Sequence, residues 1–183
     1  MENLKVVIAD DEERICQLIQ ALVDWDGLGI EIAEMAHNGI EAFDVVQKVR
    51  PDILITDIRM PGLSGLELIE KVKAACPEME IIIISGYAHF EYAQQAIRFG
   101  VGHYLLKPIN KAELTETLEK LKSKIGQRQE SERDKQVLLQ KAQKNEDYMR
   151  SKLLTQLLNA EPVTLTEEIL ENRYGIMLHS GLI

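Results

Sequence analysis

The chain has 183 residues, long enough for one or two domains, and its 45% hydrophobic content can fill a core, which excludes wholesale disorder. Its net charge is −9, from 21 basic and 30 acidic side chains, and this balance argues against binding of nucleic acid by this chain alone. Residues 1–122 carry 12 basic and 21 acidic side chains and residues 123–183 carry nine of each, which indicates two segments.

Five short apolar runs are typical of buried strands, and they cover residues 4–9, 30–36, 53–56, 80–84 and 104–106. A helical pattern follows each run: to about residue 22, from 38 to 49, from 64 to 75, from 88 to 99, and from 110 onward. Residues 24–29, with two glycines, break the first helix. A capping residue three positions before a glutamate marks three helix starts, at Asn38, Ser64 and Asn110.

The alternation of apolar strands with helices predicts a parallel sheet that helices cover on both faces. Five such units in about 120 residues fit an α/β, flavodoxin-like (βα)5 doubly wound sheet better than an eight-unit barrel. We therefore expect the strand order 2-1-3-4-5, followed by a C-terminal helical extension.

Beyond residue 122 the composition changes, and we predict a helical linker over residues 123–158 and a short helix with the start of a further domain over 159–183. One heptad phase places apolar residues, among them Leu121, Ile125, Leu139 and Met149, at the core positions of a coiled coil. The same phase also places four charged residues there. A monomeric helix that packs on another domain is therefore an equal alternative.

The cysteines and the N-terminus both favour a cytoplasmic protein. Cys16 and Cys76 have no metal-binding spacing, which fits a reducing compartment. The first residues lead straight into a strand and do not resemble a signal peptide. The longest apolar run, residues 81–84, is too short to span a bilayer.

Polar side chains follow four of the predicted strands. Asp10 and Asp11 follow the first strand, Asp57 the third, Ser85 the fourth and Lys107 the fifth. Because sites in open α/β sheets lie at the carboxyl ends of the strands, we expect these groups to converge. Three carboxylates need a counter-charge that Mg²⁺ can supply, and a nearby hydroxyl and lysine complete a phosphoryl-transfer site.

Asp57 is the candidate nucleophile, because the Pro61-Gly62 loop after it leaves room for a phosphoryl group. Taken alone, each of these residues can also be explained by an ordinary structural role. Asp11 could cap the first helix, Ser85 could belong to a plain turn, and Lys107 could be a solvated surface residue. Only their joint position at one sheet edge favours the chemical interpretation.

The sequence resembles the receiver domain of bacterial two-component response regulators over residues 1–122. The resemblance rests on the Asp10-Asp11 pair, Asp57 within DILITDIRMPGLSG, Ser85 within IIIISGY, and Lys107-Pro108 within HYLLKP. It implies that Asp57 accepts a phosphoryl group from a sensor histidine kinase.

The resemblance also implies further roles. Asp10, Asp11, Asp57 and the backbone carbonyl of Arg59 would hold Mg²⁺, and Ser85 and Lys107 would bind phosphoryl oxygens. Ser85 and Tyr104 would be the switch residues, and the bond before Pro108 would be cis.

The stretch from Ser85 to Ile109 and the helix after it are similar to receivers of AraC-type transcription regulators, which carry a C-terminal DNA-binding module. No such module is recognisable here, and the strand-like end favours a piece of a longer regulator over a regulator without an output. We expect a homodimer through the linker helix, or through the face of helix 88–99, strand 104–106 and the next helix.

Two other functions are open. One is a receiver-like interaction module that is not phosphorylated, which the complete acidic set disfavours. The other is an aspartyl-phosphate phosphotransferase. Such enzymes usually place a second acid two residues after the nucleophile, where this chain has Arg59. We therefore expect that the chain is not an enzyme.

Overall fold

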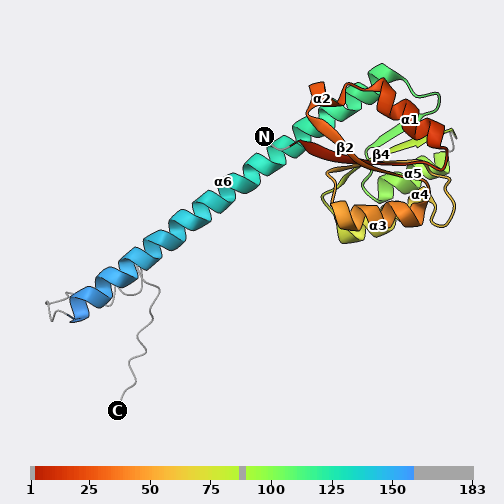
Figure 1. The fold of residues 1–183 in the computed structure, drawn as a ribbon. Helices are drawn as coiled ribbons and strands as arrows, with labels where there is room; N and C mark the ends of the chain where they lie inside the picture. Colours follow the sequence, from red (N-terminus) through yellow and green to blue (C-terminus); the bar gives the residue numbers. More distant parts are fainter. Residues whose placement is uncertain (1–2, 87–89, 159–183) are drawn as a thin grey trace, which may run out of the picture. The chain divides into compact units, whose positions relative to one another are not determined.

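A computed structural model describes residues 3–86 and 90–158 of the chain. The chain divides into two compact units, residues 1–129 and 130–183. The first unit contains a five-stranded parallel sheet with the strand order β2-β1-β3-β4-β5, which confirms the predicted topology (Figure 1). The strands are β1 (Leu4–Ala9), β2 (Ile30–Ala36), β3 (Ile53–Thr56), β4 (Glu80–Ser85) and β5 (His103–Leu106).

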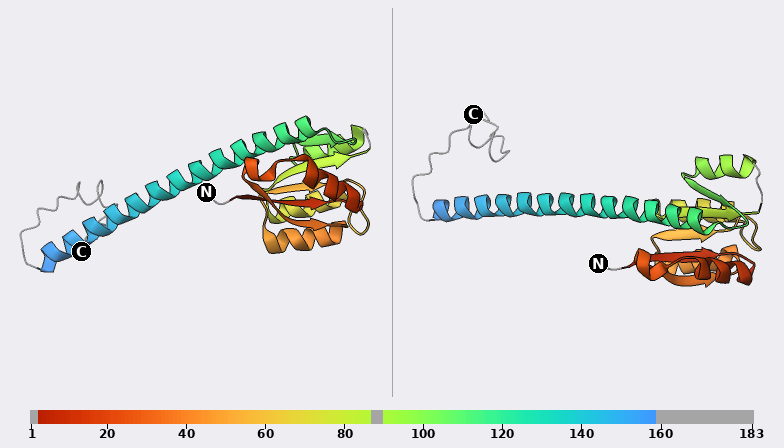
Figure 2. Two further views of the ribbon diagram at one scale, coloured as in Figure 1. Left: turned by 45° about the horizontal axis from the view of Figure 1, so that its top comes forward. Right: turned by 90° about the horizontal axis from the view of Figure 1, so that it is seen from above.

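Helices cover both faces of the sheet. The helices are α1 (Glu13–Leu22), α2 (Trp25–Leu28), α3 (Gly39–Val49), α4 (Gly65–Ala75), α5 (Phe90–Arg98) and α6 (Lys111–Leu158). Figures 1 and 2 show α3 and α4 on one face, with α1 and the first turns of α6 on the other. This arrangement follows from right-handed crossovers between parallel strands.

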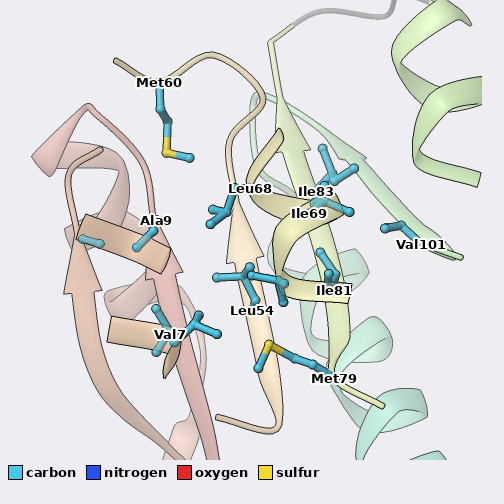
Figure 3. Packing of buried hydrophobic residues seen from close by; sticks show 14 of the residues in the cluster. Val7, Ala9, Leu54, Met60, Leu68, Ile69, Met79, Ile81, Ile83 and Val101 are labelled. Atoms are coloured by element: carbon cyan, nitrogen blue, oxygen red, sulfur yellow. The ribbon is translucent and has the colours of Figure 1, made fainter. Parts of the chain in front are cut away.

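Alternate residues of each central strand feed two separate cores, because successive side chains of a strand point to opposite faces. Val7, Leu54 and Ile81 pack against α3 and α4 (Figure 3). Val6 and Ile82 pack on the opposite face against α1 and the first turns of α6. All six side chains of β4 are buried, which explains why its sequence is a continuous isoleucine run between Glu80 and Ser85.

Side-chain caps fix the starts of the helices that follow β2, β3 and β5. The Asn38 side chain accepts a hydrogen bond from the amide of Glu41 at 2.8 Å, and Ser64 forms a complete capping box with Glu67. The Asn110 side chain accepts from the amide of Ala112 at 2.8 Å. Each cap pairs amides that the first turn of a helix leaves without intrahelical partners.

The structure adds one helix that the sequence pattern does not predict. Residues 24–29, expected to be a break, contain the short helix α2, capped by the Asp24 carboxylate, which accepts from the amide of Gly27. Gly29 ends it in the left-handed region at φ 66°, which glycine adopts without a steric penalty. A single helical turn that contains one glycine and ends at another has no apolar periodicity, so pattern analysis gives no signal for it.

The first unit extends seven residues beyond the predicted boundary at residue 122. Ile125 is fully buried against the sheet, and Arg128 pairs with Glu78 at 2.9 Å, so the fold of the unit continues to residue 129. In the second unit, residues 130–148 are helical and exposed. The predicted break at residue 159 and the elements after it lie outside the described residues. Within the part that the structure describes, no helix is long and apolar enough to cross a membrane.

Candidate functional site

Two buried carboxylates stand side by side at the carboxyl ends of β1 and β3. Ala9 pairs with Thr56 in the sheet, so the residues that follow them, Asp10 and Asp57, are neighbours. The backbone confirms this register, because the amide of Asp57 donates to the carbonyl of Ala9 at 2.9 Å. Asp10 is 1% exposed and Asp57 is 7% exposed, whereas Asp11 is exposed to solvent.

Lys107 reaches across from the end of β5 and pairs with both buried carboxylates. Its Nζ atom lies 2.8 Å from Asp10 Oδ2 and 3.2 Å from Asp57 Oδ1. The backbone amide of Lys107 donates to the carbonyl of Ser85 at 2.9 Å, which ties the lysine to the end of β4. Ser85 itself is fully buried. The ends of four strands therefore place acids, a hydroxyl and a cation in one cluster.

The second oxygen of each buried carboxylate accepts a hydrogen bond from the backbone. The amide of Glu12 donates to Asp10 Oδ1 at 3.0 Å, and the amide of Arg59 donates to Asp57 Oδ2 at 2.6 Å. Each carboxylate is thus held by one lysine contact and one amide contact. Such hydrogen bonds to ionised groups are short and stronger than neutral ones, so they fix the side-chain orientations.

Burial and charge shift the protonation equilibria of the site in opposing ways. Burial raises the pKa of Asp10 above its ordinary value, and the hydrogen bonds from Lys107 and the Glu12 amide only partly offset this effect. Burial alone would lower the pKa of Lys107, but the hydrogen bond with Asp10 and the charge of Asp57 raise it overall. The lysine is therefore held in its charged form between two acids.

The donor set of the cluster fits a hard divalent cation by its chemistry. Asp10, Asp11 and Asp57 offer carboxylate oxygens and Arg59 a carbonyl oxygen, the ligand type that Mg²⁺ prefers. In the structure itself, over residues 3–86 and 90–158, no group of three or more His, Cys, Asp or Glu side chains lies close enough together to hold a metal ion. The Lys107 ammonium lies against both buried acids and supplies one positive charge for two negative ones.

A groove of about 630 Å³ opens beside the cluster. Asp11, Arg59, Met60 and Tyr92 are among the residues that line it. The groove gives a reacting group from outside a route toward the loop that follows β3.

The two remaining predicted residues are Tyr104, in β5, and Pro108, which follows Lys107 after the end of that strand. Tyr104 is partly buried and packs against the core on the α3 and α4 face. The Lys107–Pro108 peptide bond is cis, the isomer expected at this position.

Two side chains that sequence analysis did not assign to the site contact the backbone of Asp10. Cys16 Sγ donates to the Asp10 carbonyl at 3.7 Å, and His37 Nδ1 lies 3.4 Å from the same oxygen. His37 follows β2, the neighbour of β1, so the predicted strand order could have placed it there. Cys16 lies within α1, where no sequence signal separates it from an ordinary core residue.

We expect the two cysteines to differ sharply in reactivity. Cys16 is fully buried, and burial, with the charge of Asp10, raises the pKa of its thiol to about 11. At pH 8 the reactive thiolate is therefore almost absent at Cys16, while the half-buried Cys76 is accessible. The measurement uses a disulfide reagent that releases a coloured thiol. The folded Cys76→Ser variant should not react rapidly with it, and after unfolding in denaturant one thiol, that of Cys16, should react. Rapid reaction of that native variant would contradict this expectation.

Comparison with known proteins gives a match to a protein family. The family model described as the response regulator receiver domain matches residues 6–119. The transcriptional regulatory protein YesN of Bacillus subtilis, itself uncharacterized, is 43% identical over 117 residues, which is 64% of this chain and 32% of that protein. The transcriptional regulatory protein HptR of Staphylococcus aureus is 37% identical over 117 residues, 46% of its length. The chain thus matches only a third to a half of these relatives.

Solved structures agree with this result. The receiver domain of AraT, a response regulator from Geobacillus stearothermophilus, is 40% identical with a TM-score of 0.67, covering 70% of this chain and 99% of that one. A two-component transcriptional regulator AraC from Clostridium phytofermentans is 32% identical with a TM-score of 0.65, covering 69% of this chain and 98% of that one.

Proposed function

Since the chain belongs to the response regulator receiver domain family, we propose that Asp57 accepts a phosphoryl group from a sensor histidine kinase. The observation that carries this proposal is the placement of Asp57, a buried carboxylate held between the Lys107 ammonium and the Arg59 amide beside an open groove. Fixing the orientation of a nucleophilic carboxylate lowers the entropic cost of its attack on phosphorus.

In the proposed reaction an Asp57 carboxylate oxygen forms a bond to phosphorus while the bond between phosphorus and the donor's imidazole nitrogen breaks. The imidazole keeps the electron pair, and Asp57 becomes an acyl phosphate. Lys107 and the Ser85 hydroxyl would each bind a phosphoryl oxygen. Mg²⁺ held by Asp10, Asp11, Asp57 and the Arg59 carbonyl would neutralise phosphoryl charge when it is bound.

The acyl phosphate adds about −1.5 to −2 charges at the site, and we propose that Ser85 and Tyr104 respond to it. The response would shift an existing two-state equilibrium of the face formed by α5, β5 and the first turns of α6. Two apolar side chains already lie exposed on this face, Ile97 at 70% and Leu106 at 46%. Because two copies could bury these side chains against each other, their exposure supports dimerisation through this face as the readout. Dimerisation through α6 is the alternative.

The relatives suggest the purpose of the switch. Because two of them are named as transcriptional regulatory proteins, we propose that phosphorylation of Asp57 controls transcription through a DNA-binding module of the whole regulator. This chain by itself would bind neither DNA nor a membrane, would act in the cytoplasm and would not turn over substrates as an enzyme.

The test is the intact mass of the chain after incubation with Mg²⁺ and acetyl phosphate. We expect one labile phosphoryl adduct on the wild type and none on Asp57→Asn. Asp44→Asn, a change of the same kind at an exposed position on α3, should keep the adduct. Light scattering on the same samples should show dimers only after phosphorylation. An adduct on Asp57→Asn would disprove the assignment of the acceptor, and an unchanged oligomeric state would disprove the readout.

A further inference from the structure

A cluster of four charged residues lies at the end of the sheet opposite the acceptor site. It consists of Glu78, Glu80, Lys124 and Arg128, and we call it the Glu80 cluster. Lys124 Nζ lies 2.8 Å from Glu80 Oε1 and 2.9 Å from Oε2. Arg128 Nη1 lies 2.9 Å from Glu78 Oε2 and 3.6 Å from Glu80 Oε1. The cluster therefore joins α6 to the start of β4.

The position of Glu80 makes these ion pairs important. Glu80 is 7% exposed and begins a strand whose other residues are four isoleucines and Ser85, all of them buried. A carboxylate in such surroundings is unfavourable unless cations and hydrogen-bond donors pair with it. Both cations that form ion pairs with Glu80 come from α6, so these pairs exist only while that helix stays in place. The charge of Lys73 on α4 also acts on Glu80, but it does not depend on α6.

The cluster also lies at the end of the part of α6 that belongs to the first unit. The buried apolar contacts of the helix end with Ile125, and Lys124 and Arg128 lie on either side of it. Arg128 also donates to the backbone carbonyl of Glu78 at 2.9 Å, so it binds the main chain that leads into β4. Residues 129–148, which follow, are all exposed.

Strand β4 connects this cluster to the acceptor site. Its first residue is Glu80, and its last is Ser85, whose carbonyl accepts from the amide of Lys107. The strand is paired on both edges, with β3 and with β5, and Ile82 and Ile84 share a core cluster with the first turns of α6. A close-packed strand with no solvent-exposed residue transmits a displacement at one end to the other rather than absorbing it.

We propose that the Glu80 cluster couples the acceptor site to the docking of residues 122–129 of α6, with β4 as the connecting element. This inference rests on the proposed function, because it requires that Asp57 exists in a free and a phosphorylated state. If phosphorylation of Asp57 displaces Ser85, the displacement passes along β4 and changes the stability of the ion pairs at Glu80. By thermodynamic linkage, a change in these ion pairs also affects the acceptor site. The element that this coupling regulates is the segment of α6 formed by residues 122–129.

Hydrogen exchange measured by mass spectrometry on the full chain tests the proposal. In the Lys124→Gln/Arg128→Gln double variant, the amides of residues 122–129 should exchange at least about tenfold faster than in the wild type. Lys120→Gln is the matched control, because Lys120 pairs with Glu116 on the exposed face of the same helix, where both side chains are 64% exposed. The control should leave exchange in this segment unchanged.

Phosphorylation supplies the decisive comparison. In the wild type, the phosphoryl adduct, verified by intact mass, should change exchange over residues 122–129 by at least about threefold. The double variant should still form the adduct but lose this response. An adduct without a change in exchange, or an undiminished response in the double variant, would overturn the coupling alone. Absence of the adduct in the wild type would overturn the proposed function as well.

Discussion

The Gly65→Ala variant should be largely unfolded at 25 °C. A Cβ atom on Gly65 would lie 2.0 Å from the carbonyl oxygen of Asp57 and 2.9 Å from Cα of Ile58. Both obstacles are backbone atoms, and the amide of Gly65 also donates to the carbonyl of Ile58 at 2.8 Å, so the loop cannot move aside without losing this bond. Ordinary overpacking costs about 1–3 kcal/mol. A backbone clash of this depth should exceed that range and remove most of a typical stability of about 5–15 kcal/mol.

Urea unfolding followed by circular dichroism measures this effect. Gly126→Ala is the matched control, because a Cβ at Gly126 meets no atom within 4 Å and the residue lies inside α6. Alanine is the better helix former, so the control should gain up to about 1 kcal/mol. A Gly65→Ala variant as stable as the wild type would show that the loop after β3 accommodates a side chain. It would contradict the conclusion that α4 approaches Asp57 too closely for one.

Replacing Lys107 with methionine should destabilise the fold by about 3 kcal/mol in the absence of divalent cations. The side chains of Asp10 and Asp57 are 2% and 8% exposed, and both lose their cation in this variant. Two buried carboxylates then repel each other without compensation. Since Mg²⁺ at the same carboxylates would supply the missing positive charge, millimolar Mg²⁺ should stabilise the variant more than the wild type.

The measurement is urea unfolding of both proteins with and without Mg²⁺, with Lys111→Met as the control. Lys111 is an exposed lysine at the start of α6, and its replacement should change stability by no more than about 0.5 kcal/mol. If Lys107→Met lost no more stability than this control, the lysine would not be neutralising the buried acids. If Mg²⁺ stabilised the wild type and Lys107→Met equally, the result would argue against the idea that Lys107 and Mg²⁺ neutralise the same two carboxylates.

Sequence analysis predicted the sheet because its signals are local. The runs that became β1 and β4 are apolar on both faces, and the caps at Asn38 and Ser64 are short-range patterns that the structure contains. Strand order then placed Asp10 beside Asp57 without further information. This part of the prediction needed periodicity, capping chemistry, the known strand order of flavodoxin-like folds and the handedness of crossovers.

The remaining features depend on tertiary packing, which local sequence patterns do not specify. The pairing of Glu80 with Lys124 joins residues 44 positions apart, and the contact of Cys16 with Asp10 requires the exact packing of α1 on β1. The predicted boundary at residue 122 was placed where charged residues begin. Helix α6 instead continues to bury Ile125 among exposed charged neighbours, which a composition change cannot reveal.

The burial of Leu114, Leu118, Leu121 and Ile125 has a consequence for synthesis on the ribosome. These residues complete the core on the α1 face, so that core cannot close until residue 125 has left the exit tunnel. Strands β1 to β4 emerge earlier, with one apolar face covered only in part, by α1. We therefore expect a nascent chain arrested before residue 125 to bind chaperones that recognise exposed apolar surface, and one arrested well beyond it to resist protease.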